Sequence, residues 1–118
     1  MSNLIHDFRD YRARMNEKIL SSGNKVMKRI YSIDTLAYQD GALSARTKEM
    51  MGLVSSMVLR CDDCVKYHLE KCYEHKVTTD EIFEIFSIAN LIGGTIVIPH
   101  TRRAVEYWET LTTQQDNK

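Results

Sequence analysis

Residues that break helices are scarce in this chain, which has a single proline and five glycines among 118 residues. Average sequences contain about twelve such residues per hundred. A β-sandwich or β-barrel of this length needs many turns, and therefore many more of these residues. Their scarcity argues against those folds and favours an all-α fold, in which helices are joined by short turns.

An excess of charge of one sign is also absent, because 16 lysines and arginines balance 16 aspartates and glutamates. Domains that bind nucleic acid usually carry a basic excess, so we expect no nucleic-acid partner. No apolar run approaches the roughly 18 residues of a membrane span, and we expect no membrane partner. Residues 1–14 carry charges throughout and show no apolar segment typical of a signal peptide. A cytoplasmic protein is therefore the expectation.

Apolar residues recur at spacings of three and four along most of the chain, which predicts amphipathic helices. We expect about six helices in one domain, 1–118, with a frayed polar tail at 112–118. The first three helices are expected at 4–19, from 26 to near 40–41, and from Ser44 onwards. The other three are expected from 60–62 to about His75, from a cap at 79–81 to 93–94, and through Leu111 with Pro99 in the first turn.

The third and fifth of these helices carry an unusual number of apolar side chains, at 50–58 and 82–92. A surface helix with one buried stripe needs fewer of them. We therefore expect self-association, the alternative being a central helix buried within one copy. Gly52 interrupts the first stretch, where glycine costs about 1 kcal/mol relative to alanine. Its presence predicts a close helix crossing.

Cysteine is scarce as well, and an odd count of three does not fit a secreted disulfide scaffold. Two of the cysteines form the motif Cys61-x-x-Cys64, and His68 follows four residues later. On a helix these three residues share one face, and cysteines at this spacing can meet disulfide geometry. A helix start lowers the pKa of a thiol, and His68 could take the proton of Cys64. This is the nucleophile–base arrangement of cysteine enzymes.

A metal site at the same residues is the competing interpretation. Cys61, Cys64 and His68 would need a fourth ligand from elsewhere to hold zinc. Cys72 shares their face but lies about 16 Å from Cys61 along a straight helix, too far to bind the same ion. We therefore expect no metal and a core position for Cys72.

Three charged or titratable residues complicate the cysteine site. Asp62 and Asp63 lie beside the cysteines and oppose a thiolate unless they point to solvent. His100 could face the cysteines or simply cap the last helix.

The segment from about Ala45 to Leu111 resembles the carboxymuconolactone decarboxylase superfamily, on its alkylhydroperoxidase D-like (AhpD-like) branch. The resemblance is carried by Lys48-Glu49, the twelve-residue step to Cys61, Cys61-x-x-Cys64-x-x-x-His68, the stretch 79–82, Ala89, Gly93-Gly94 and His100. It implies an AhpD-like helical bundle that assembles as a homo-oligomer, with a hexamer as our first choice and a trimer as our second.

The resemblance also implies an enzyme, a thiol-dependent alkylhydroperoxidase with peroxiredoxin-type antioxidant activity. Cys64 would attack the hydroperoxide, Cys61 would resolve the sulfenic acid to a disulfide, and His68 and Glu49 would form a proton relay. The position of Cys61 at the helix start favours the opposite order of the cysteines, so the order stays open. A dithiol or a thiol reductant protein would re-reduce the pair, and no bound cofactor is expected.

Two other functions compete with this one. The chain could be a redox-responsive or disulfide-exchange protein with little peroxide turnover, or a binding module that kept the cysteines by descent. The decarboxylases that give the family its name lack the cysteine pair, so lactone decarboxylation is not expected.

Overall fold

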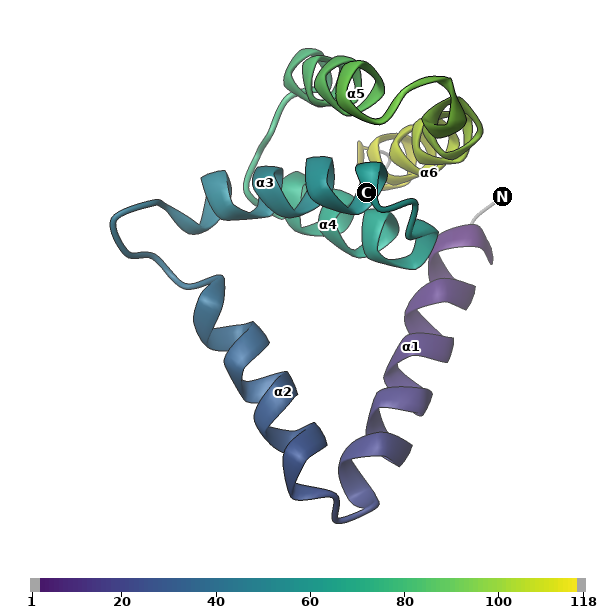
Figure 1. Ribbon diagram of the computed structural model, residues 1–118. Coiled ribbons are helices and arrows are strands. Elements are labelled where there is room, and N and C mark those ends of the chain that lie inside the picture. The colour runs from purple at the N-terminus through teal and green to yellow at the C-terminus, as the bar shows by residue number, and fades with distance from the viewer. Residues whose placement is uncertain (1–2, 117–118) are drawn as a thin grey trace.

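The computed structural model describes residues 3–116, and all regular structure in that range is helical (Figure 1). The elements are α1 (Asn3–Ser21), α2 (Lys25–Ala37), α3 (Ala45–Val58), α4 (Asp62–Glu74), α5 (Thr79–Gly93), a 3₁₀ turn η1 (Thr95–Val97) and α6 (Ile98–Asp116). The predicted all-α fold with six helices is confirmed.

Side-chain caps define the starts of α3 and α5. Ser44 is the N-cap of α3, as predicted, and accepts a hydrogen bond from the Thr47 backbone N–H. At α5 the cap is Thr78, one residue before the predicted Thr79. Its hydroxyl accepts from the Glu81 N–H while the Glu81 carboxylate accepts from the Thr78 N–H. This reciprocal pair satisfies two amides that the helix start would otherwise leave without partners.

The tail that we predicted to be frayed is helical where the structure describes it. α6 continues to Asp116, and residues 117–118 lie outside the described range. The helix contains no proline or glycine beyond its first turn, so nothing in its backbone ends it early. The Thr112 hydroxyl also donates to the Glu109 carbonyl. The sixth helix is thus longer than its apolar pattern, which ends at Leu111, and the fraying of 112–118 stays a prediction.

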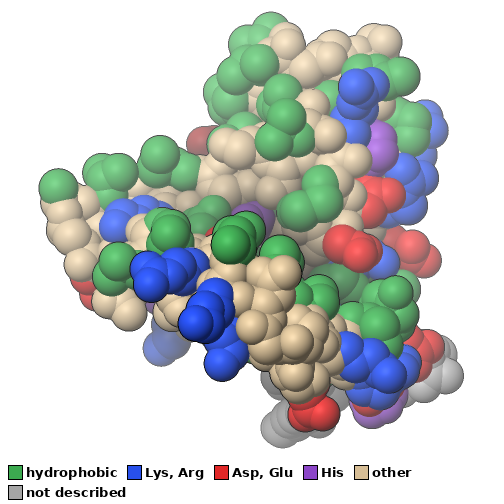
Figure 2. Space-filling view, turned by 60° about the horizontal axis from the view of Figure 1, so that its bottom comes forward, with side chains coloured by type: hydrophobic (Ala, Val, Ile, Leu, Met, Phe, Trp, Pro, Cys, Tyr) green, Lys and Arg blue, Asp and Glu red, His purple; other side chains and the backbone are tan. Residues whose placement is uncertain are grey.

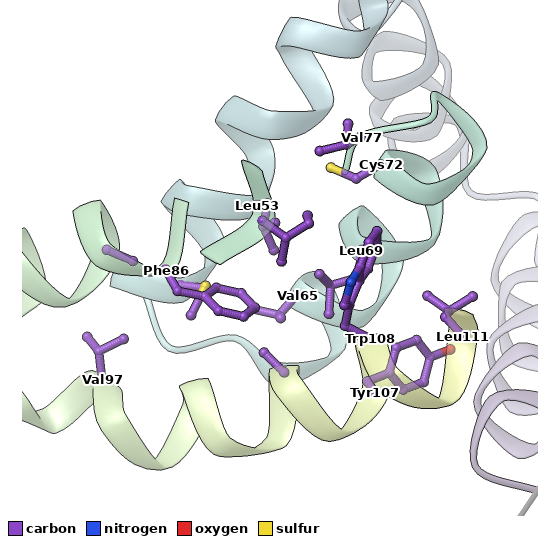
Figure 3. Close-up of a cluster of buried hydrophobic side chains, with 14 of the residues drawn as sticks. Leu53, Val65, Leu69, Cys72, Val77, Phe86, Val97, Tyr107, Trp108 and Leu111 are labelled. Carbon is purple, nitrogen blue, oxygen red and sulfur yellow. The ribbon is translucent and has the colours of Figure 1, made fainter. Parts of the chain in front are cut away.

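The hydrophobic core lies among α3, α4, α5 and α6, with α3 packed on α4 and α5, and α4 packed on α6 (Figures 1 and 3). Trp108 and Tyr107 of α6 are its largest fully buried side chains. Their polar ends are bonded, because the Trp108 indole donates to Thr79 and the Tyr107 hydroxyl donates to Glu70. Cys72 lies in the same core, as predicted, and burial raises the pKa of its thiol to about 12.

Helices α1 and α2 extend from this core as an open V (Figure 1). The base of α1 meets α6, where Ile5 is buried and Phe8 packs edge-on against Tyr107. α2 contains no buried residue. The apolar positions that predicted this helix, Val26, Ile30, Ile33 and Ala37, are therefore exposed in a single copy, and so is Leu36.

A second group of exposed apolar side chains lies on α5 and the turn after it, and comprises Phe83, Ile88, Leu91, Ile92 and Ile96. Figure 2 shows hydrophobic side chains spread among charged ones over one face of the molecule. Much of the apolar surplus of the fifth helix is therefore not covered within one copy. No helix within residues 3–116 is long and apolar enough to cross a membrane.

Candidate active site

The cysteine pair lies at the start of α4, where Cys61 is the N-cap and Cys64 lies in the first turn. Arg60 has a positive φ of 61°, which turns the chain sharply between α3 and α4. The Cα atoms of Cys61 and Cys64 are 5.3 Å apart and their sulfur atoms form a disulfide. The Cys64 N–H also donates to the Cys61 sulfur at 3.2 Å. The prediction that this spacing meets disulfide geometry is confirmed.

Glu49 of α3 and His68 of α4 form a buried pair. Their side chains are 6% and 10% exposed, and Glu49 Oε1 lies 2.8 Å from His68 Nδ1. A buried carboxylate needs such a partner because desolvating an unpaired charge is costly. When the carboxylate accepts this bond, Nδ1 carries the hydrogen and Nε2 is left to exchange a proton. The structure thus brings together two residues that only the resemblance had linked.

Gly52 provides the space in which this pair lies. A Cβ atom at residue 52 would come within 2.6 Å of the His68 ring and 2.7 Å of the Tyr38 hydroxyl. The close approach predicted at Gly52 is confirmed, with the His68 side chain as the neighbour from α4. Tyr38, just beyond α2, lies over His68 with ring centroids 5.3 Å apart. Burial, and then the charge of Glu49, raise the pKa of Tyr38.

Asp62, the residue after Cys61, is paired with two basic side chains of α6. Its carboxylate oxygens lie 2.7 Å from His100 Nδ1 and 2.8 Å from Arg103 Nε. Burial disfavours the charged carboxylate, but the hydrogen bonds from His100 and Arg103 outweigh it and lower the pKa of Asp62. These partners offset the negative charge that we expected to oppose a thiolate. His100, for which we considered facing the cysteines or capping the last helix, is bonded to Asp62, the residue after Cys61.

A pocket of about 330 Å³ opens at Cys64 and His68. Helices α1 and α4 form most of its wall, and α2 contributes Asp34. Cys64 is exposed and lines this pocket, whereas Cys61 is not among the lining residues. A larger pocket of about 650 Å³ lies beside Trp108 and contains none of the predicted site residues. Of these two pockets, the smaller is the one in which a bound molecule can reach both Cys64 and His68.

The described part of the chain contains no group of three or more histidine, cysteine, aspartate or glutamate side chains placed to hold a metal ion. The ligand set that we considered from the sequence was Cys61, Cys64 and His68. In the structure the two cysteines are bonded to each other, and the imidazole Nδ1 is bonded to Glu49. The arrangement is that of a disulfide at the start of α4 and a buried carboxylate–imidazole pair between α3 and α4.

Comparison with known proteins shows the family of this chain. The model of the carboxymuconolactone decarboxylase family matches residues 24–107, a span that includes Glu49, Cys61, Cys64 and His68. The chain belongs to the carboxymuconolactone decarboxylase family. Its fold and its relatives are consistent with the AhpD-like branch that the sequence resembles.

Solved structures of the family share the fold over nearly the whole chain. A Thermotoga maritima protein is 47% identical, with a TM-score of 0.92 over 95% of this chain and 98% of its own. A Legionella pneumophila family protein, 21% identical, covers 91% of this chain and 96% of its own with a TM-score of 0.83. At that identity the likeness shows the fold alone.

Two further relatives match by sequence. An uncharacterised protein of Cupriavidus necator is 31% identical over 75 residues, which are 64% of this chain and 66% of that protein, just under two thirds. A protein of the cox locus of Paracoccus denitrificans is 21% identical over 84 residues, or 71% of this chain and 76% of its own.

Proposed function

We propose that this protein is a thiol-dependent hydroperoxide reductase that uses Cys61 and Cys64 as its redox pair. One observation carries the proposal: exposed Cys64 lines the same pocket as His68, whose imidazole is bonded to buried Glu49. This arrangement places a nucleophile and a proton carrier at one cavity, as covalent catalysis requires. The Thermotoga relative has been suggested to take part in an antioxidative response, which supports the same reading.

The proposed reaction begins at Cys64. Its thiolate attacks the terminal oxygen of the hydroperoxide, an S–O bond forms as the O–O bond breaks, and the alkoxide leaves as an alcohol with a proton delivered through His68. The Cys61 thiolate then attacks the oxidised sulfur. An S–S bond forms, the S–O bond breaks, and hydroxide leaves with a proton as water. An external dithiol or thiol reductant protein returns two electrons and two protons, so no bound cofactor takes part.

Two observations bear on the order of the cysteines. Cys64 is exposed in the pocket beside His68, which supports Cys64 as the attacking residue. Cys61 is the N-cap, and its sulfur receives the Cys64 N–H, which would stabilise a thiolate on Cys61 once the pair is reduced. We assign the attack to Cys64 because a nucleophile must reach its substrate, and we assign the resolving step to Cys61.

Replacing Glu49 with glutamine tests the proton relay. The substitution keeps size and hydrogen bonding but removes the charge that orients and stabilises the imidazolium of His68. Peroxide reduction should slow by at least about tenfold, because acid–base help of this kind is worth roughly 10²–10⁴-fold. The measurement is peroxide consumption by the reduced protein in stopped flow, with circular dichroism and oligomer mass recorded on the same sample.

The matched control is Glu74→Gln, which removes an exposed carboxylate at the end of α4 and should leave the rate unchanged. A folded Glu49→Gln protein with an unchanged rate would remove Glu49 from the relay. A loss of rate that appears only together with loss of helical signal would show that Glu49 is structural.

A second candidate function is disulfide exchange with little peroxide turnover. The exposure of Cys64 favours it, because a partner thiolate needs access to one sulfur of the disulfide. The two functions can be distinguished by adding peroxide to the reduced protein and measuring both peroxide consumption and free thiols. A reductase consumes peroxide and loses two free thiols in step, whereas an exchange protein loses thiols only to a disulfide partner.

The proposal includes assembly as a homo-oligomer, with a hexamer as first choice and a trimer as second. The apolar faces of α2 and α5 are exposed in one copy, and such contiguous apolar surface usually marks an interaction site. Light scattering at micromolar concentration should therefore give several times the mass of one chain. A mass near 13.7 kDa would contradict the assembly. It would not contradict the redox chemistry, which the peroxide assay tests separately.

A further inference from the structure

The pocket at Cys64 has one apolar wall that is fixed to the rest of the molecule. Phe8 and Met15 of α1 and Tyr67 of α4 line it. Phe8 is held edge-on against the core residue Tyr107, with ring centroids 6.0 Å apart. Tyr67 is likewise held edge-on against His68, with centroids 5.4 Å apart. An apolar group of a substrate would therefore meet aromatic and thioether surface that is already in place.

The charges at the same pocket are mostly negative. Asp34 of α2 and Asp63 of α4 are exposed carboxylates that line it. Arg12 of α1 is the one lysine or arginine among the lining residues, and its guanidinium lies 4.1 Å from the centre of the Tyr67 ring. One positive and two negative charges leave a formal net charge of −1 on the rim, and Glu49 adds a further negative charge behind His68.

From this charge pattern we infer that the pocket selects uncharged organic hydroperoxides and discriminates against those that carry a carboxylate. The inference rests on the proposed reductase function and specifies its substrate class. An uncharged apolar group gains contact with Phe8, Met15 and Tyr67 at no electrostatic cost. A carboxylate in the same space is repelled by Asp34 and Asp63, and that repulsion is stronger near protein surface than in bulk water.

The test compares two hydroperoxides of matched shape, cumene hydroperoxide and its para-carboxylate. For the reduced wild-type protein at low salt, kcat/KM should be at least about tenfold higher for the uncharged compound. The ratio should shrink as salt is added, because exposed charges are screened within about 10 Å at 0.1 M. In the double variant Asp34→Asn with Asp63→Asn, the ratio of the two kcat/KM values should fall severalfold toward one. Because both substrates are measured on the same variant, any change in the reactivity of Cys64 cancels in this ratio. Glu84→Gln, an exposed acid on α5 outside the pocket, is the control and should change neither rate.

Equal rates for the two compounds would overturn the inference. Faster reduction of the carboxylate would also overturn it and would identify Arg12 as the residue that binds the carboxylate. A preference that survives in the double variant would also overturn it. If neither compound is reduced, the proposed function fails, but the pocket is still tested by binding. The disulfide form should then bind cumyl alcohol more tightly than its para-carboxylate in NMR titrations, and equal binding would overturn the inference.

Discussion

Replacing Cys64 with serine is expected to abolish peroxide reduction, with a loss of at least about 10³-fold in rate. Removal of the nucleophile from a covalent catalyst costs on the order of 10⁶-fold in a well-studied case, and a serine hydroxyl neither ionises at neutral pH nor forms a disulfide. The structure adds that Cys64 is the cysteine exposed in the pocket beside His68. The measurement is peroxide consumption together with peptide mapping, which should find the Cys61–Cys64 link only in the wild-type protein.

Two companion variants make this result specific. Cys72→Ala removes a buried thiol with a pKa of about 12 and should keep both the rate and the link. Cys61→Ser should allow Cys64 to react once with peroxide and then stop as a sulfenic acid. If Cys64→Ser instead reacts once and Cys61→Ser does not react, the roles of the two cysteines are reversed. A main bridge to Cys72 in the wild-type protein would contradict the assigned redox pair.

Replacing Gly52 with alanine should disrupt the Glu49–His68 pair although the new side chain is a single methyl group. That carbon would lie 2.6 Å from the His68 ring, closer than van der Waals contact allows, and His68 is held by its bond to Glu49. A misplacement of about 1 Å in a catalytic group costs roughly a hundredfold in rate. We expect a loss of that order in peroxide reduction.

The expected effect of Gly52→Ala on stability is smaller because two terms oppose each other. Alanine favours the helix by about 1 kcal/mol relative to glycine, whereas overpacking costs typically about 1–3 kcal/mol. The free energy of unfolding should therefore fall by about 1 kcal/mol, as measured by urea denaturation. Gly41→Ala is the matched control, since the nearest atom to its Cβ would be the Lys48 Nζ at an ordinary 3.6 Å. A Gly52→Ala protein with wild-type rate would show that His68 can move without consequence.

The parts of the site that lie within one helix could be predicted from the sequence. Cys61, Cys64 and His68 follow steps of three and four residues, and helical geometry alone places them on one face. The positions of the six helices followed for the same reason, since apolar spacing and caps are local signals. The extent of α6 beyond Leu111 was not predicted, because the polar residues at 112–116 do not continue the apolar pattern.

The parts that depend on packing between helices could not be predicted from spacing. Glu49 is one glutamate on a helix, and its burial against His68 follows from how α3 crosses α4. Tyr38 and Asp34 approach the site only because of the way α2 returns toward α3 and α4. The contact of His100 with Asp62 joins residues 38 positions apart. Long-range contacts of this kind leave no periodic pattern in a single sequence.

The exposed helix α2 bears on how firmly the substrate pocket is held. Segments with few buried contacts open locally at low free-energy cost and exchange their amide hydrogens quickly. Asp34, which lines the pocket, lies on α2, and α2 contains no buried residue in one copy. Covering the apolar face of α2 in an assembly would raise the cost of local opening. The selectivity of the pocket would then depend on protein concentration by mass action. Dilution would increase local opening of α2, which carries Asp34, before it changed the structure around the cysteines on α4.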